Sequence, residues 1–168
     1  ADGAAAATGP GEVIRQIRLF GGLIRKSVYG AVVELMVANG YRPGDLGDPG
    51  PEDTFFLFPY DWRKSGVETA AALLDRLEAI RAVRGESRLE VDLIVQSDAA
   101  QIGRYLIRYG DASLEDAESG AARPPARVSI RKMIFVGTAS GGAIRGLREM
   151  NRGRRYVPVI GRTPRPEV

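Results

Sequence analysis

The 168-residue chain contains no histidine and no cysteine, and these two absences exclude several kinds of chemistry. Without cysteine there can be no disulfide and no thiol nucleophile. Without histidine there is no imidazole, the group that most often takes the proton of a catalytic serine. Lysine is the other common base beside serine, but Lys26, Lys64 and Lys132 all lie more than a helical turn from Ser97, the serine considered below. A serine enzyme built on this chain would therefore need a base from elsewhere.

Long apolar runs and nucleotide-binding motifs are also missing. No stretch approaches the ~18 to 20 uninterrupted apolar residues of a membrane span, so we expect no transmembrane segment. No secretory signal is visible, which slightly favours a cytoplasmic location. Neither G-x-G-x-x-G nor the phosphate-loop Gly-Lys-Ser/Thr occurs, so we expect no nucleotide and no other cofactor or metal. The net charge of +3 is small, and no nucleic-acid partner is expected.

What is present is the composition of one globular domain, with 27% charged and 44% apolar residues. Residues 1–11 are rich in alanine and glycine and predict a flexible leader, and residues 12–168 predict a single α/β domain. Helices are expected at 12–26, at 27–39 with Ser27 as the cap, from a Ser65/Glu68 capping box to near Gly85, at 99–109 and at 143–150. Strands are expected at 54–58, 91–95 and 128–136, with a loop at 111–127 and an extended segment at 156–160.

Alternating strands and helices predict a parallel sheet with helices on both faces. Three parallel strands would leave two long sheet edges unprotected. We therefore expect the chain to be part of a larger fold whose first strands and last catalytic elements are not recognisable here.

The central stretch of the chain is Glu90 to Tyr109, where the apolar period changes from that of a strand to that of a helix. Only Gln96, Ser97 and Asp98 lie between the two. A serine on so tight a turn is lifted clear of the sheet, and the N–H groups of the following helix point toward any oxyanion formed beside it. This is the geometry of a nucleophile elbow. The alternative is an ordinary strand–turn–helix in which Ser97 makes local hydrogen bonds or caps the helix.

Four short motifs carry a family resemblance. They are Phe-Pro-Tyr-Asp-Trp-Arg at 58–63, Val-Asp-Leu-Ile at 91–94 before the serine, Arg-Tyr-Leu at 104–106 and Val-Gly-Thr at 136–138. In this order they resemble the lecithin:cholesterol acyltransferase-like branch of the α/β-hydrolases. The resemblance implies a partial α/β-hydrolase fold, with Ser97 as nucleophile and the Asp98 N–H as an oxyanion donor. Val95 and Ala99 stand where the family's Gly-x-Ser-x-Gly pattern has glycine.

The same resemblance implies an acyl ester or lipid substrate, with the base and acid supplied by a missing remainder of the hydrolase domain. Possible substrate-cleft residues are Gln96, Tyr60, Asp61, Trp62, Arg63 and Thr138. For Tyr60 to Arg63 a structural role is the alternative, with Trp62 packed over the strand end and Asp61 paired with Arg63. Asp92 is expected to be a partnered strand residue. Two functions remain open: a serine esterase, lipase or acyltransferase, and a catalytically inactive hydrolase-like binding module.

Overall fold

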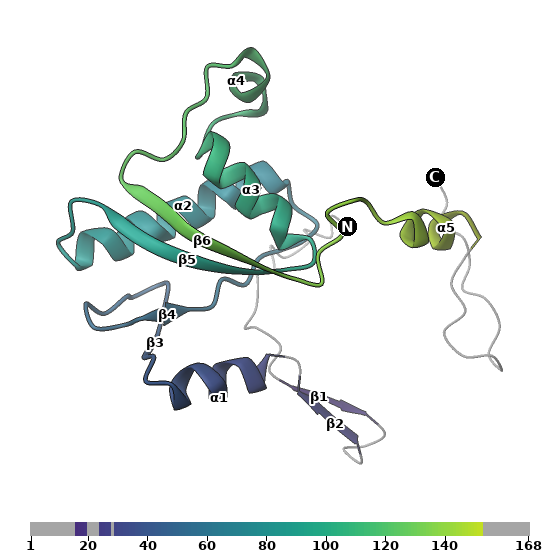
Figure 1. Cartoon of the computed structure of the whole chain (residues 1–168), viewed down its shortest axis with the longest axis horizontal. Helices are drawn as coiled ribbons and strands as arrows, with labels where there is room; N and C mark the ends of the chain where they lie inside the picture. Colours follow the sequence, from purple (N-terminus) through teal and green to yellow (C-terminus); the bar gives the residue numbers. More distant parts are fainter. Residues whose placement is uncertain (1–15, 20–23, 28, 153–168) are drawn as a thin grey trace, which may run out of the picture.

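The computed structural model describes residues 16–19, 24–27 and 29–152, so the expected segments 1–11 and 156–160 lie outside the described residues. The described part is a mixed α/β structure with short parallel strand pairs (Figure 1). Its elements are, in order, β1 (Gln16–Leu19), β2 (Ile24–Ser27), α1 (Gly30–Ala38), β3 (Pro43–Gly44), β4 (Phe55–Phe56), α2 (Gly66–Val83), β5 (Leu89–Gln96), α3 (Ala99–Tyr109), α4 (Leu114–Ser119), β6 (Val128–Val136) and α5 (Ile144–Arg152).

The main sheet is the parallel pair β5–β6. Its register runs from Leu89 opposite Val128 to Gln96 opposite Val136, with one irregularity after Val91. We expected residues 54–58 to form a third strand of this sheet, and the structure shows that they do not. β4 is only two residues long and pairs in parallel with β3. Strand pairing depends on contacts distant in sequence, which local periodicity does not reveal.

Helices α2 and α3 cover one face of the β5–β6 pair (Figure 1). The core between them consists of buried aliphatic side chains from both layers: Ala70, Leu74, Leu77, Ile80, Leu89, Ile102, Leu106 and Val128. Each leucine, isoleucine or valine of this core contributes roughly 1.5–3 kcal/mol when fully buried. This layer holds the two strand ends that frame the candidate site.

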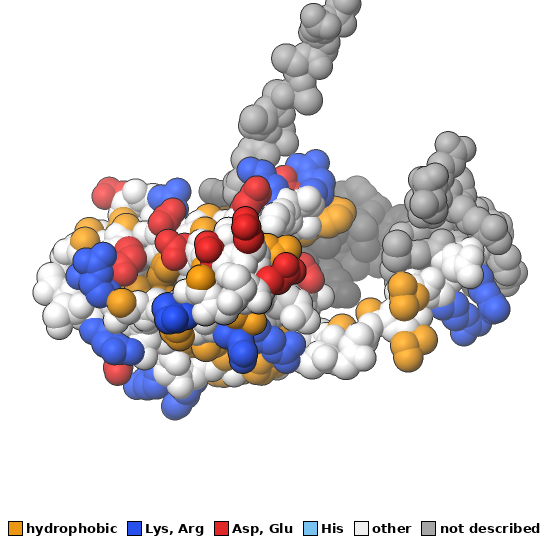
Figure 2. All heavy atoms as spheres, turned by 90° about the horizontal axis from the view of Figure 1, so that it is seen from above, with side chains coloured by type: hydrophobic (Ala, Val, Ile, Leu, Met, Phe, Trp, Pro, Cys, Tyr) orange, Lys and Arg blue, Asp and Glu red, His pale blue; other side chains and the backbone are white. Residues whose placement is uncertain are grey.

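The other face of the pair is largely uncovered, contrary to the expectation of helices on both faces. Ile94 and Ile134 are register partners on that face, and their side chains are 54% and 50% exposed. Successive side chains of a strand point to opposite faces of the sheet. Because Val95 is buried on the face that α3 covers, the Ile94 side chain points to the opposite face. Helix α5 projects from the body, and its hydrophobic side chains are visible at one end of the molecule (Figure 2).

Several local expectations are confirmed. The structure has the strands expected at 91–95 and 128–136 and the helices expected at 99–109 and 143–150, within two residues at each end. Helix α2 ends as expected before Gly85, whose φ is +65°. Ser65 is its N-cap, but the hydroxyl accepts from the second helical N–H, that of Val67, at 3.2 Å.

Three other expectations are wrong. In the described part of the helix expected at 12–26, residues 16–19 and 24–26 instead belong to the antiparallel pair β1–β2, in agreement with the alternation of polar and apolar residues in Gln-Ile-Arg-Leu at 16–19. Ser27 belongs to β2, and α1 has Tyr29 at its N-cap without a side-chain hydrogen bond. The 111–127 loop contains the short helix α4, because Ser113 caps it by accepting the Asp116 N–H at 3.1 Å.

Candidate active site

Ser97 lies in the turn between β5 and α3, as the change of period predicts. Its φ is +54°, and among the residues that the structure describes it is the one non-glycine residue with positive φ. Its N–H donates to the Val136 carbonyl at 3.1 Å, and its own carbonyl accepts from the Ala100 N–H at 3.3 Å. A non-glycine residue in this conformation costs roughly 1–3 kcal/mol and is found most often at functional sites. The two hydrogen bonds hold the strained turn at the end of the sheet, where Ser97 is exposed.

Asp98 follows as the N-cap residue of α3, with φ −66° and ψ −28° and no capping hydrogen bond from its side chain. Within the described ranges its backbone N–H donates to no carbonyl or side chain. An N–H at a helix N-terminus carries part of the positive end of the helix dipole. This N–H can therefore donate a hydrogen bond to an oxyanion bound beside Ser97.

The middle of α3 packs closely on the sheet at Gly103. Gly103 is buried, and a Cβ placed on it would lie 2.7 Å from the Met133 Sδ and 3.4 Å from the Val95 Cγ1. Val95 is accommodated because Gly103 leaves room for it, and its side chain is only 7% exposed. Glycine at 103, rather than at 95, therefore provides the close approach of strand and helix.

The Tyr-Asp-Trp-Arg run lies in the loop between β4 and α2. The expected pair is present: Arg63 donates from Nε and Nη2 to the two Asp61 carboxylate oxygens, each at 2.8 Å. These bonds lower the pKa of Asp61 to about 2. Trp62 does not pack over the strand end, since its side chain is 77% exposed. Partial burial raises the pKa of Tyr60, and the negative charges of Asp98 and Tyr29 raise it further.

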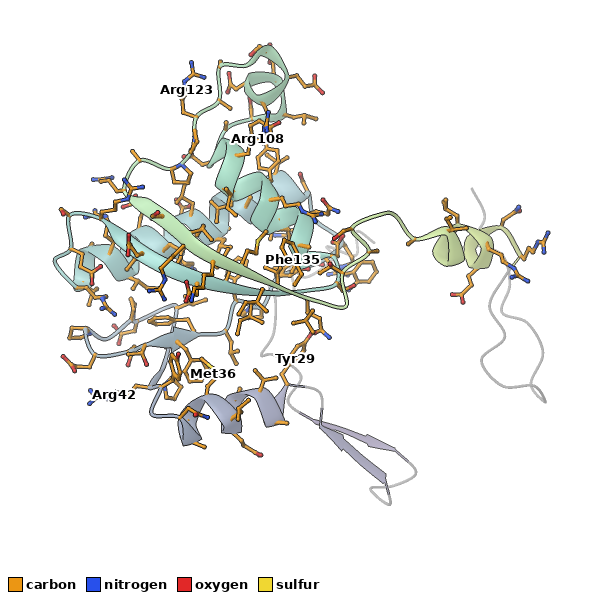
Figure 3. The ribbon with its side chains drawn as sticks, in the orientation of Figure 1. Tyr29, Met36, Arg42, Arg108, Arg123 and Phe135 are labelled. Carbon is orange, nitrogen blue, oxygen red and sulfur yellow. The ribbon has the colours of Figure 1, made fainter. Side chains whose placement is uncertain are left out.

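Beyond β6, hydroxyl groups and a cation lie at the same edge of the sheet as Ser97. The Thr138 and Ser140 hydroxyls are 3.1 Å apart, and the Arg104 Nη2 donates to the Ser140 Oγ at 2.9 Å. The Arg104 guanidinium also lies over the Phe135 ring, 5.0 Å from its centre; Figure 3 labels Phe135. We did not predict Arg104 as a site residue, because its contacts with residues 135 and 140 arise from tertiary packing.

Gln96 and Asp92 are the remaining residues for which the sequence predicted a position. Gln96 is exposed at the last position of β5, opposite Val136. Asp92 is partnered as expected, since Arg131 donates to its carboxylate at 3.0 and 2.6 Å and lowers its pKa. No group of three or more metal-binding side chains lies together in the described part of the chain. No helix there is long and apolar enough to cross a membrane.

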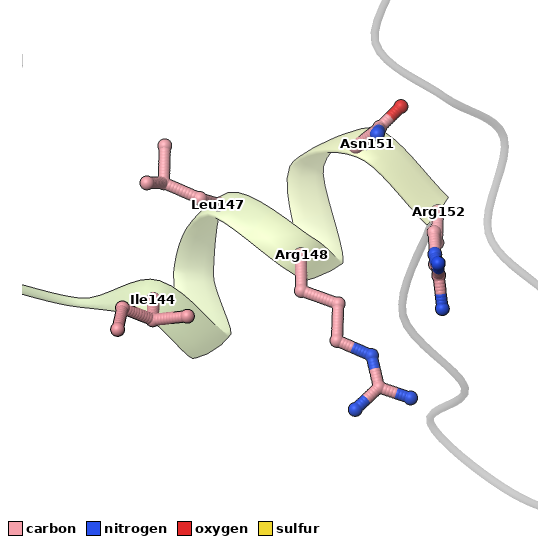
Figure 4. Close-up of a pocket in the computed structure, with 5 residues that line it drawn as sticks. All are labelled: Ile144, Leu147, Arg148, Asn151 and Arg152. Atoms are coloured by element: carbon pink, nitrogen blue, oxygen red, sulfur yellow. The ribbon is translucent and has the colours of Figure 1, made fainter.

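Two surface hollows lie away from Ser97. One is lined only by residues of α5, namely Ile144, Leu147, Arg148, Asn151 and Arg152 (Figure 4). The other lies between α2, the end of α3 and the 111–127 segment, and it contains acidic, basic and aromatic side chains. Neither is lined by Ser97, which is exposed.

Comparisons with protein families, with characterised proteins and with solved structures found no match. The family resemblance therefore depends on the short motifs alone.

Proposed function

We propose that the chain carries the nucleophile half of a serine esterase of the α/β-hydrolase type. The observation that supports this most strongly is the φ of +54° at Ser97, in a turn of two residues between a parallel strand and a helix. An ordinary capping serine has no need of a strained backbone. A nucleophile elbow does, because the strain lifts the hydroxyl away from the sheet.

In the proposed reaction the Ser97 Oγ attacks the acyl carbonyl of an ester. The Asp98 N–H donates to the oxyanion, and the alcohol leaves as the acyl-enzyme forms. Water or a second alcohol then takes the acyl group, which restores the serine. Both steps need a base to remove a proton and return it to the leaving group.

We infer that this base comes from outside these 168 residues, since the sequence has no histidine. Lys132 cannot replace it, because its register partner Asp92 lies four residues before the strand end, about 13 Å along β5. By itself the chain should therefore be nearly inactive. The oxyanion donor and the bound geometry can still leave a residual rate.

Free imidazole can test this proposal by supplying the missing group. We expect imidazole to increase the hydrolysis of a 4-nitrophenyl ester by the wild-type chain above the rate that imidazole gives in solution. Ser97→Ala should abolish the protein-dependent part. Ser87→Ala is the matched control, because Ser87 is exposed in the turn just before β5. Equal rates for the wild type and Ser97→Ala at all imidazole concentrations would reject the proposal.

The second candidate is a binding module without catalysis. The exposed apolar pair Ile94–Ile134, on the strands that end at the elbow, favours it. Exposed apolar side chains that adjoin on a sheet can mark contact with another polypeptide or a ligand. Imidazole rescue at Ser97 separates the two candidates.

A further inference from the structure

A positive charge is held at the same edge of the sheet as the elbow. β5 and β6 are parallel and end together, at Gln96 and Val136. The Ser97 N–H bonds the Val136 carbonyl, and the segment that carries Thr138 and Ser140 leaves the sheet at that residue. Arg104 reaches the same segment from α3 by its hydrogen bond to Ser140.

The guanidinium of Arg104 is oriented but not neutralised. The Phe135 ring lies against its face, and one N–H is used by the Ser140 hydroxyl. No carboxylate among the described residues lies within ion-pair distance of Arg104, whereas Arg63 and Arg131 each hold an aspartate. An arginine fixed in this way keeps further N–H donors for a planar or tetrahedral anion. The Thr138 and Ser140 hydroxyls can rotate to donate to the same anion.

We propose that Arg104, Ser140 and Thr138 form an anion-binding subsite beside Ser97, which takes a phosphate or carboxylate group of the ligand. In the part that concerns an ester substrate, this rests on the proposed function. From Asp98 to Arg104 the helix rises about 9 Å, a span that the alcohol part of an ester can bridge. The ester would then be held by its negative group while its acyl carbonyl lies at the elbow.

Binding of phenyl phosphate to the full chain tests the subsite without any need for catalysis. We expect its addition to shift the NMR signals of the Arg104 side chain and of the 138–140 backbone. Arg104→Gln should weaken the binding about tenfold, the usual loss of one charge-assisted hydrogen bond. Arg104→Lys should be intermediate, because lysine keeps the charge and loses the planar fork. Benzyl alcohol, which has the ring without the charge, should cause no such shift.

Arg108 provides the matched control. It lies four residues later on α3, and its guanidinium is 5.5 Å from the centre of the Tyr109 ring. If Arg108→Gln weakens phenyl phosphate binding as much as Arg104→Gln, or if neither variant weakens it, the subsite is rejected. A circular dichroism spectrum and an unfolding curve for each variant establish that the comparison is between folded proteins.

Two further arms identify the source of the anion. Co-sedimentation with phosphatidylglycerol vesicles, compared with phosphatidylcholine vesicles, tests whether Arg104 binds an anionic lipid surface. Titration with inorganic phosphate tests whether a free anion binds on its own. The phenyl phosphate titration decides whether the subsite exists, and these two arms decide its source. Arg104-dependent binding of phosphatidylglycerol vesicles alone assigns the anion to a lipid headgroup, and Arg104-dependent binding of inorganic phosphate assigns it to a free anion. If phenyl phosphate binds through Arg104 but imidazole rescue fails at Ser97, the proposed function is wrong and the subsite stands.

Discussion

Replacement of Ser97 by glycine and by alanine measures the strain at the elbow. Alanine keeps the unfavourable φ of +54°, whereas glycine adopts it without a steric penalty. Removing the steric penalty stabilises the folded state by roughly 1–2 kcal/mol. The greater freedom of glycine in the unfolded chain destabilises the folded state by about 0.5–1 kcal/mol. We therefore expect Ser97→Gly to be more stable than Ser97→Ala by up to about 1.5 kcal/mol.

The same pair of substitutions at Ser87 gives the opposite sign. Ser87 has no positive φ, so glycine there only adds freedom to the unfolded chain. Ser87→Gly should be less stable than Ser87→Ala by about 0.5–1 kcal/mol. The comparison within each pair cancels the loss of the hydroxyl group, which both substitutions share.

Urea unfolding followed by circular dichroism gives the four free energies, and thermal melting checks them. A difference of ~1 kcal/mol corresponds to a shift in Tm of about 2–4 °C for a chain of this size. If Ser97→Gly is less stable than Ser97→Ala, as at position 87, the turn is not strained. The structural argument for a nucleophile elbow would then be refuted.

Three other predictions concern the surroundings of the site. Gly103→Val should destabilise the protein by about 1–3 kcal/mol in urea unfolding, because the new side chain must displace the Met133 Sδ and crowd the stiff Val95 side chain; no loss would show that Met133 and α3 can move aside. NMR titration should give Asp61 a pKa of about 2, and Arg63→Gln should return it toward ~3.9; an unchanged pKa would mean that the ion pair does not form in solution. The stabilising effect of this pair is present above the unfolded-state pKa and is lost as the pH falls toward 2. Ser65→Ala should cost ~1 kcal/mol by removing the N-cap of α2, and equal unfolding curves would contradict this.

Local patterns predicted the segment around Ser97 well. The strand-to-helix change of period is contained within twenty residues, and a turn as short as Gln96 to Asp98 allows few backbone conformations. The ion pair of Asp61 with Arg63 was predictable for the same reason, since its partners are two residues apart. The φ of Ser97 agrees with the elbow hypothesis, which came from the change of period and the shortness of the turn.

Features that depend on distant contacts were not predictable. Nothing in Phe-Phe-Leu-Phe at 55–58 indicates that β4 pairs with Pro43–Gly44 instead of joining β5. The exposure of Trp62 is a property of what surrounds it, and the sequence of the loop alone suggested burial. Arg104 is separated from Ser140 by 36 residues, so only the fold reveals their hydrogen bond.

The central claim is that the Ser97 hydroxyl acts as a nucleophile when a base is supplied. Mass-spectrometric mapping of a fluorophosphonate adduct, formed with and without imidazole, tests it most directly. We expect a single adduct at Ser97 that depends on imidazole and is absent from Ser97→Ala, while Ser87→Ala labels as the wild type does. An adduct at a different serine, or no adduct at saturating imidazole, would contradict the claim.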